Sequence, residues 1–303
     1  MRPGPDPGVA RGAERGPSRR PAAVLREARA ADLPAVAAYL ADRLGRRAQH
    51  FVRYFEYGWL ADKPDLGVLV EEGGRIGGFL GAIYARRPVR GRELLFCNLT
   101  SWHVDDHLRN LSLEMMARCL ARPGCTFTTF SPSEKVVAVL RYFKFQRVDA
   151  EKVLFAPVSG LSGLLRRPRP RISWGGELPA RLTDAERRIF DDHRGYRCGH
   201  FLVERGVERC YFVTVRRGRG ARAFADVLYA SDPELLAAAV AWTHVPLALT
   251  HGTFLTGLDR RLLGRRPATA IGYRGLRPLM FRSETLAEHE LDTLYSELVP
   301  MYG

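Results

Sequence analysis

The chain has 303 residues, 46% of them hydrophobic, and its 47 lysines and arginines exceed its 33 aspartates and glutamates to give a formal net charge of +14. The length predicts more than one domain, and the hydrophobic share is sufficient for a buried core. No apolar run approaches the ~20 residues that span a bilayer, which argues against a membrane span.

The positive charge alone does not indicate a nucleic-acid partner. Only four of the 47 basic residues are lysines, and the arginines are dispersed, without a basic helix or a basic-aromatic stripe. Attraction to anionic ligands, including phosphate-bearing ones, remains the expectation. The five cysteines are odd in number and form no C-x-x-C pair. We therefore expect reduced thiols in a cytoplasmic protein, with neither a disulfide framework nor a metal site.

The first half predicts a mixed sheet with helices on both faces. Residues 1–22, "MRPGPDPGVARGAERGPSRRPA", are rich in proline, glycine and arginine and predict a disordered leader. The elements expected after it are a strand at 24–28, helices at 32–44 and 48–60, strands at 66–72, 76–86 and 93–104, a helix at 111–121, a strand at 125–132, a helix at 133–143 and a strand at 144–158. Asp32 is the expected N-cap of the first helix, and Gly73-Gly74 predicts a hairpin turn. This order assigns residues 23–158 to one α/β domain.

Periodicity breaks between the two halves. Residues 159–181 predict a linker, because glycine, proline and arginine dominate them. Residues 182–303 then predict a second α/β domain with a similar alternation of strands and helices. It contains a helix capped at Thr183 or Asp184, a hairpin around Gly206, a strand at 222–230, a helix at 232–244, a strand at 246–255 and a C-terminal helix at 284–299.

One stretch, "WHVDDHLRNLSLEMMARCL" from Trp102 to Leu120, has the parts of a diphosphate cradle. A strand that hands over to a helix leaves unpaired amides at the helix start, which favour an anion. Arg109 adds a charged donor suited to a phosphate. A plain strand-to-helix turn with a solvated arginine is the alternative interpretation of this stretch.

The first half resembles the GNAT superfamily of acyl-CoA-dependent acyltransferases over residues 24–158. "LREARAADLPAVAAYL" resembles the opening strand and helix, "VDDHLRNLSLEMM" the R/Q-x-x-G-x-G/A cofactor motif, and "SEKVVAVLRYFKF" the helix that leads into a Gly-Phe pair. The resemblance implies tandem GNAT-like domains, the second without its own cofactor site. It also implies that acetyl-CoA or a longer acyl-CoA is bound by Trp102, His103, Val104, Arg109, Asn110, Leu111, Ser112, Leu113 and Ser133.

Several family positions are substituted. Ser112 and Glu114 stand where the motif has glycines, Lys144 precedes Phe145 in place of glycine, and Leu140 occupies the position of a frequent acid tyrosine. Glycine lets the backbone approach a phosphate closely, and a carboxylate turned inward at residue 114 would repel it. The motif is therefore recognisable in pattern and altered in detail.

Acyl transfer requires a group that takes a proton from the acceptor and a group that can protonate the leaving thiolate. The candidates are His103, Glu93 and Tyr142, with a structural strand histidine as the alternative interpretation of His103. In the second half, Asp232-Pro233 begins a helix with one donor missing, which argues against a second cradle. His251, Asp259 and Arg260 are candidate acceptor contacts there, with ordinary loop polarity as the alternative.

The sequence therefore predicts transfer of an acyl group from acyl-CoA to an amine or hydroxyl of a small or carbohydrate-like acceptor, without a metal. Two alternatives remain open. One is a tandem aminoacyl transferase with a tRNA-borne donor, and the other is a non-catalytic relative in polysaccharide export. The sequence does not determine the oligomeric state.

Overall fold

The computed structural model describes residues 22–148, 151–157, 168–264, 270–274 and 277–302. Residues 1–21 of the predicted leader and 159–167 of the predicted linker lie outside this part of the chain. In the described residues, no helix combines the length and apolar character needed to cross a membrane.

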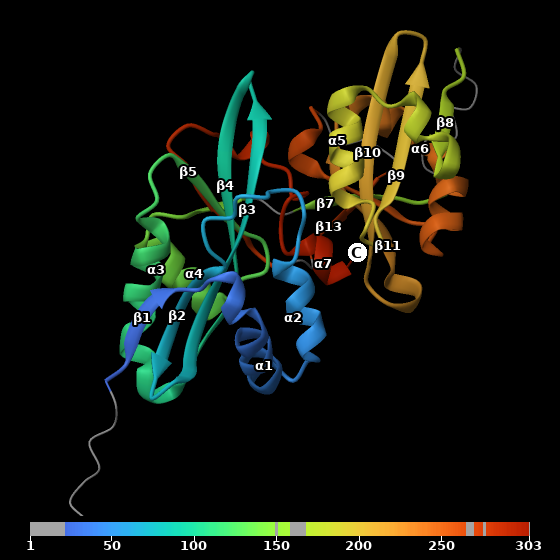
Figure 1. The fold of residues 1–303 in the computed structure, drawn as a ribbon. Helices are drawn as coiled ribbons and strands as arrows, with labels where there is room; N and C mark the ends of the chain where they lie inside the picture. The colour runs from blue at the N-terminus through green and yellow to red at the C-terminus, as the bar shows by residue number, and fades with distance from the viewer. Residues whose placement is uncertain (1–21, 149–150, 158–167, 265–269, 275–276, 303) are drawn as a thin grey trace, which may run out of the picture.

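The first sheet contains seven strands within the described residues, in the order β1-β2-β3-β4-β5-β14-β6 (Figure 1). Their bounds are β1 Val24–Glu27, β2 Gly67–Glu72, β3 Arg75–Val89, β4 Arg92–Val104, β5 Cys125–Thr129, β14 Leu279–Arg282 and β6 Gln146–Val148. The β2–β3 hairpin turns at Gly73 and Gly74, both with positive φ, which confirms the predicted turn.

The second sheet also contains seven strands within the described residues, in the order β8-β9-β10-β11-β12-β7-β13. Their bounds are β8 Arg171–Trp174, β9 Gly199–Arg205, β10 Glu208–Arg217, β11 Phe224–Ala230, β12 Thr256–Asp259, β7 Lys152–Phe155 and β13 Ile271–Tyr273. Strand β8 falls inside the predicted linker, so residues 171–174 are part of the second sheet and not of a connecting loop.

The two sheets exchange one strand each. The late strand β14 pairs antiparallel with β5 and β6 in the first sheet, and β7 pairs antiparallel with β12 and β13 in the second. The predicted single strand at 144–158 is therefore two strands in different sheets. The predicted boundary at residue 158 does not mark where the chain changes sheet. Local pattern marks a strand but cannot assign its partner, because pairing is decided by contacts distant in sequence.

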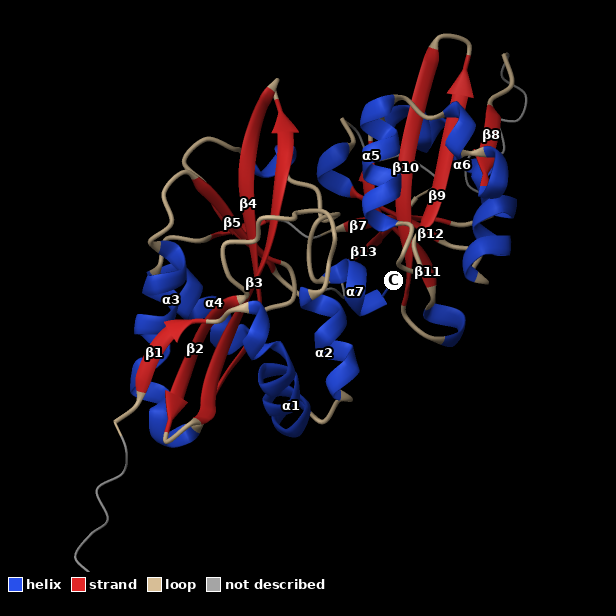
Figure 2. Cartoon of the chain, viewed as in Figure 1, coloured by secondary structure: helices blue, strands red, loops and turns tan. Residues whose placement is uncertain are grey.

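Helices cover both faces of each sheet (Figure 2). The helices α1 (Leu33–Leu44) and α2 (Ala48–Phe55) lie on one face of the first sheet, and α3 (Ser112–Leu120) and α4 (Glu134–Tyr142) lie on the other. In the second sheet, α6 (Pro233–His251) covers one face, and α5 (Asp184–His193) and α7 (Leu298–Tyr302) pack toward the other.

One apolar cluster joins the two sheets. It contains residues from α1, α2, β3, β10, β11 and the C-terminal segment, among them the fully buried Phe79, Val213 and Leu294. Figure 1 shows α7 and the end of the chain between the two sheets. The halves therefore share a core in addition to the exchanged strands, which makes them one packed unit.

The second half corrects two further predictions. Helix α6 continues through Pro246 to His251, so the strand expected at 246–255 is wrong; burial of Pro246 and Leu247 against the sheet outweighs the backbone amide that proline lacks. The helix expected at 284–299 is a short 3₁₀ turn at Glu288–Glu290 followed by irregular chain and α7. That segment also bonds to strand β11, since the Thr293 N–H donates to the Leu228 carbonyl at 3.2 Å.

The expected N-caps have different outcomes. Thr183 caps α5 and accepts from the Glu186 amide, and Asp232 caps α6 and accepts from the Leu235 amide, as predicted. Asp32 precedes α1, but its carboxylate bonds to Arg26 and to the Arg29 amide and makes no cap bond to the helix.

Candidate active site

In the first sheet, the parallel pairing between strands β4 and β5 ends before β4 does. They pair in parallel from Leu95–Asn98 to Cys125–Thr128, while β4 continues to Val104 paired with β3 but not with β5. A parallel strand beyond its last partner leaves backbone donors and acceptors on that edge available to another chain or a ligand.

A bulge in β4 lies just beyond this point. Thr100 pairs with Gly81 and His103 pairs with Phe79, so two β4 residues oppose one residue of β3. Ser101 has φ of 54°, a left-handed conformation that costs a residue with a Cβ free energy. Such strained bulges are common beside functional sites, where they redirect side chains.

The bulge reverses which face each residue uses. Before it, Phe96 packs in the core toward α1 and α2, whereas Cys97 packs toward α3 and α4. After it, Trp102 and Val104 pack toward α3 and α4. His103 is therefore directed toward α1, where its ring lies 5.9 Å from that of Tyr39 in an edge contact.

A buried carboxylate, that of Glu297, lies where the strands separate. The Phe130 amide and the Ser131 hydroxyl, both just past β5, donate to Glu297 Oε1 at 3.0 Å each. The Glu297 amide donates to Asn98 Oδ1 at 2.9 Å, and Asn98 Nδ2 donates to Thr128 Oγ1 at 3.1 Å. Residues from β4, the end of β5 and the C-terminal segment thus converge on one carboxyl group.

The environment of Glu297 favours its neutral form. The residue is fully buried, and burial raises the pKa of its carboxyl although four hydrogen bonds act in the opposite direction. Its second oxygen, Oε2, is buried without a hydrogen-bond partner in the described part of the chain. Sequence analysis missed this residue; the weak signal was a single charge in the otherwise apolar run "LYSELVPM".

Helix α2 supplies polar groups on the same side. The Tyr54 hydroxyl and His50 Nε2 lie 3.2 Å apart, and the charge of Glu297 is among the causes that raise the pKa of Tyr54, after burial. His50 is half-buried, and burial lowers its pKa. Tyr54 therefore lies close enough to Glu297 to feel its charge, and His50 lies next to Tyr54 at the partly exposed side of α2.

The predicted diphosphate cradle has a different backbone from the one expected. Residues Asp106–Leu111 form a 3₁₀ helix that runs directly into α3, and the Ser112 amide donates to the Arg109 carbonyl. Amides within a helical run point at preceding carbonyls and are not free to bind an anion. Asn110, Leu111 and Leu113 belong to the same run.

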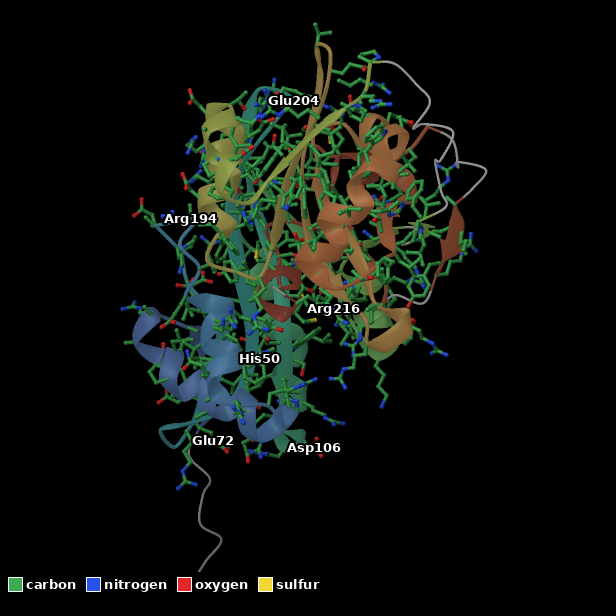
Figure 3. All side chains as sticks on the ribbon, turned by 90° about the vertical axis from the view of Figure 1, so that its right-hand side faces the viewer. His50, Glu72, Asp106, Arg194, Glu204 and Arg216 are labelled. Carbon is green, nitrogen blue, oxygen red and sulfur yellow. The ribbon has the colours of Figure 1, made fainter. Side chains whose placement is uncertain are left out.

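The side chains of this turn suit a phosphate better than its backbone does. The side chain of Arg109 is 72% exposed and, among the described residues, pairs only with Asp106, whose side chain is 88% exposed and lies at the rim of the molecule (Figure 3). An exposed pair of this kind contributes ~0–1 kcal/mol, so a phosphate can readily take Arg109 from it. Glu114 points to solvent, as does Leu113. The turn therefore offers the guanidinium of Arg109 as a possible donor to an anion, but not a cradle of open amides.

The three sequence-predicted catalytic residues are not brought together. Glu93 is exposed near the β3–β4 hairpin end, eight residues before Ser101 and thus ~26 Å along the strand. Tyr142 is 76% exposed at the end of α4. His103 faces α1, as described above. Ser133, the predicted cofactor contact, is an exposed residue that precedes α4. In the described ranges, no group of three histidine, cysteine, aspartate or glutamate side chains could hold a metal ion.

The corresponding region of the second half is filled by the chain itself. Asp232 Oδ1 accepts from the Leu235 amide at 2.9 Å and Pro233 has no amide hydrogen, so the start of α6 is closed to an anion. Thr293 bonds to Leu228 of β11, where β11 carries its own register shift. The polar candidates are separate: His251 is buried on Thr214, and Asp259 is buried in a pair with Arg261.

Comparison with known proteins rests on structure. No family model and no curated protein matches the sequence. A GCN5-related N-acetyltransferase from Anabaena variabilis is similar at TM-score 0.58 and 8% identity, over 88% of this chain and 74% of that one. A structure described as a putative acetyltransferase, from Pyrococcus horikoshii, is similar at TM-score 0.51 and 13% identity, over 93% of this chain and 96% of that one. A fungal glucosamine N-acetyltransferase region is similar at TM-score 0.52 and 11% identity, over 86% of this chain and 38% of that one.

These similarities extend over both sheets, because they cover at least 86% of the chain. At such low identity they report the arrangement of helices and strands and not the chemistry. They agree with the observed geometry of two mixed sheets flanked by helices, the first with diverging parallel strands and a bulge. The chain has the fold of the GNAT superfamily.

Proposed function

We propose that the protein transfers an acyl group from an acyl-CoA thioester to the amine or hydroxyl of a small or carbohydrate-like acceptor. The observation that carries this proposal is the break between β4 and β5 after Asn98, next to the bulge at Ser101, within a GNAT fold. The free edge of β4 suits an amide-bearing arm that pairs with it as an added strand would.

The residues of the chain have distinct roles in this proposal. The edge at Trp102–Val104 aligns the pantetheine arm of the donor, and Arg109 pairs with a phosphate. The thioester supplies an activated carbonyl carbon. The polar groups Glu297, Tyr54 and His50 lie on the α1 and α2 side, which is where this proposal places the acceptor, whereas the α3 and α4 side is closed by apolar residues.

An amino sugar is one acceptor class compatible with this proposal. The similar fungal structure is described as a glucosamine N-acetyltransferase region, which supports carbohydrate-like amines as acceptors to test first. The altered turn at Asp106–Leu111 favours the competing hypothesis of a non-catalytic relative, since its amides are occupied. A tRNA-borne donor predicts steeply salt-dependent tRNA binding instead.

Calorimetry with acetyl-CoA and longer acyl-CoAs tests the donor site, and thiol release from acetyl-CoA in the presence of acceptors tests turnover. We expect saturable binding and acceptor-dependent release of free coenzyme A. No binding at millimolar acyl-CoA would reject the enzyme hypothesis and favour the non-catalytic one.

A further inference from the structure

Helix α6 is a surface helix without charged side chains along its length. No aspartate, glutamate, lysine or arginine occurs in residues 235–250, although 26% of the chain is charged. The inner side of the helix packs into the apolar cluster of the second sheet through residues such as Leu236 and Val240. A helix that meets solvent on its other side normally carries polar residues there, so an apolar outer side indicates a second contact.

Large apolar side chains are exposed on this outer side. Val245 is 67% exposed and Leu249 is 74% exposed, and Phe254, just beyond the end of the helix, is 67% exposed. The apolar cluster that joins the two halves contains no α6 residue, and α6 lies on the side of the second sheet that faces away from the first (Figure 1). Packing between the halves therefore leaves these side chains uncovered.

The outward residues form one row along the helix. Their spacings alternate between four and three residues, which keeps them on one side of an α-helix. We call this the outer row of α6; it consists of Glu234, Ala238, Ala241, Val245, Ala248 and Gly252. The three alanines are half-buried, and such small residues let a second helix approach closely.

The outer row is symmetric about its midpoint. Read in either direction its spacings are four, three, four, three and four, so an antiparallel copy centred at residue 243 sets Ala241 against Val245 and Ala238 against Ala248. A two-fold contact requires this property, because the same patch has to serve on both partners. The row therefore complements itself.

The charges at the two ends of the row also complement each other. Exposed Glu234 stands at the start of α6. Exposed Arg216 lies near the end, because it follows Thr214 by two residues on β10 and Thr214 Oγ1 lies 2.7 Å from His251 Nε2. In an antiparallel pair, the acidic start of one helix lies beside the basic end of the other. At the flank, the Arg169 guanidinium lies 5.9 Å from the ring centre of Trp242, so the apolar row has a polar rim.

We propose that the outer row of α6 binds a second copy of this chain through an antiparallel, two-fold contact of the two helices. The inference does not depend on the proposed acyl transfer. Helix α6 has 19 residues. Such a helix is about 28 Å long and about 10 Å wide, so the row buries roughly 300 Å² per chain. A standard interface buries ~800 Å² per partner, so we expect a reversible dimer with a Kd of tens of micromolar.

The composition of the row favours a second copy over a lipid surface. Helices that lie on membranes carry lysine or arginine on their polar side, whereas the row contains neither. Two copies of a chain with net charge +14 repel each other at long range, and salt screens that repulsion. We therefore expect the dimer to persist or strengthen as NaCl rises from about 0.1 to about 0.5 M, whereas attraction to anionic lipid would weaken.

Sedimentation velocity of the full chain between about 5 and about 200 µM measures the association. We expect the weight-average mass to rise from 34.0 kDa toward twice that value. Val245→Lys and Leu249→Lys each set a cation close to its own copy and should raise the dimer Kd at least ~10-fold. The matched control is Val207→Lys, at the fully exposed β9–β10 turn, which should dimerise as wild type does.

Cysteine cross-linking tests the antiparallel direction. Chains carrying Ala238→Cys or Ala248→Cys are treated with a short bifunctional maleimide, separately and as a mixture, with wild type as the baseline for the native cysteines. In an antiparallel pair the two positions oppose each other, whereas each lies ~15 Å from its own copy. We expect the mixture to cross-link well above either variant alone.

Several results would overturn the inference. Wild type that stays monomeric at the highest concentration would do so, as would a dimer that both lysine variants retain, since the copy would then bind elsewhere. Equal cross-linking of each cysteine variant alone would refute the antiparallel contact. If wild type stays monomeric and co-sediments with vesicles of phosphatidylcholine and phosphatidylglycerol, the row binds a membrane and not a copy. Melting temperatures check the fold, and if Val245→Lys is destabilised, Leu249→Lys decides the test.

Discussion

The exchanged strand β7 carries a buried charge cluster whose disruption should measurably destabilise the protein. Lys152 on β7 and Arg217 on β10 each place a nitrogen 2.9 Å from a carboxylate oxygen of Asp226 on β11. The side chain of Asp226 is 1% exposed, and those of the two cations are 6% and 11% exposed. The pairs are at ion-pair distance without hydrogen-bond geometry.

Asp226→Ala removes the only anion of this cluster and leaves two buried cations facing each other. Breaking a buried ion pair by deleting one partner costs ~3–5 kcal/mol. An unfolding entropy of ~2.1 cal/mol/K per residue gives about 0.6 kcal/mol/K for this chain, so the midpoint should fall by about 5–8 °C. Lys152→Met leaves the Arg217–Asp226 pair intact and should cost clearly less.

Thermal unfolding followed by circular dichroism, with urea titration for the free energy, measures these differences. The double variant Lys152→Met with Asp226→Ala should recover part of the loss, because one of the two uncompensated cations is gone. If Asp226→Ala unfolds within 1 °C of wild type, or if the double variant shows simple additivity, the cluster does not hold β7 in the second sheet.

Three further predictions follow from the geometry. Ser101→Gly should raise the free energy of unfolding by up to ~1 kcal/mol and Ser101→Val should lower it, because φ is 54° there; equal urea midpoints for the two variants would contradict this. Arg109→Ala should weaken acetyl-CoA binding about 10-fold in calorimetry with an unchanged melting temperature, since the side chain is exposed and its ion pair in the described part of the chain is the one with exposed Asp106; an unchanged Kd would remove Arg109 from the proposed donor site. Burial lowers the pKa of His193 to about 4, so the unfolded chain takes up its proton first and stability falls as pH drops below ~6.5. At pH 5 the loss from this group is about 2 kcal/mol, and His193→Phe should flatten that part of a melting-temperature profile.

The strand and helix sequence of the first half was largely predictable. Helix α3, the β2–β3 turn and the diverging strand β4 all lie close to their expected positions. Local signals suffice for such elements, because periodicity and turn residues act over a few residues. The predicted diphosphate cradle shows the limit of this approach, since the motif located this turn but not the 3₁₀ conformation of residues 106–111.

The candidate site depends on contacts that no local pattern contains. Asn98, Ser131 and Glu297 are distant in sequence and meet only because the C-terminal segment passes between the two sheets. From the sequence, the candidates for the proton transfers of acyl transfer were therefore residues on the same strand as the predicted cofactor motif, such as His103 and Glu93. The structure separates those two and brings Glu297 to the end of β5.

The amino-acid sequence by itself determined the number and order of most elements, the GNAT-like character of the first half and the turn at the start of α3. Only the tertiary structure decided that β7 and β14 change places and that Glu297 enters the space between β4 and β5. The physical reason is that a strand's periodicity specifies its buried face but not its neighbour. Neighbours are selected by pairings such as that of Lys152 in β7 with Asp259 in β12, which join residues far apart in the chain.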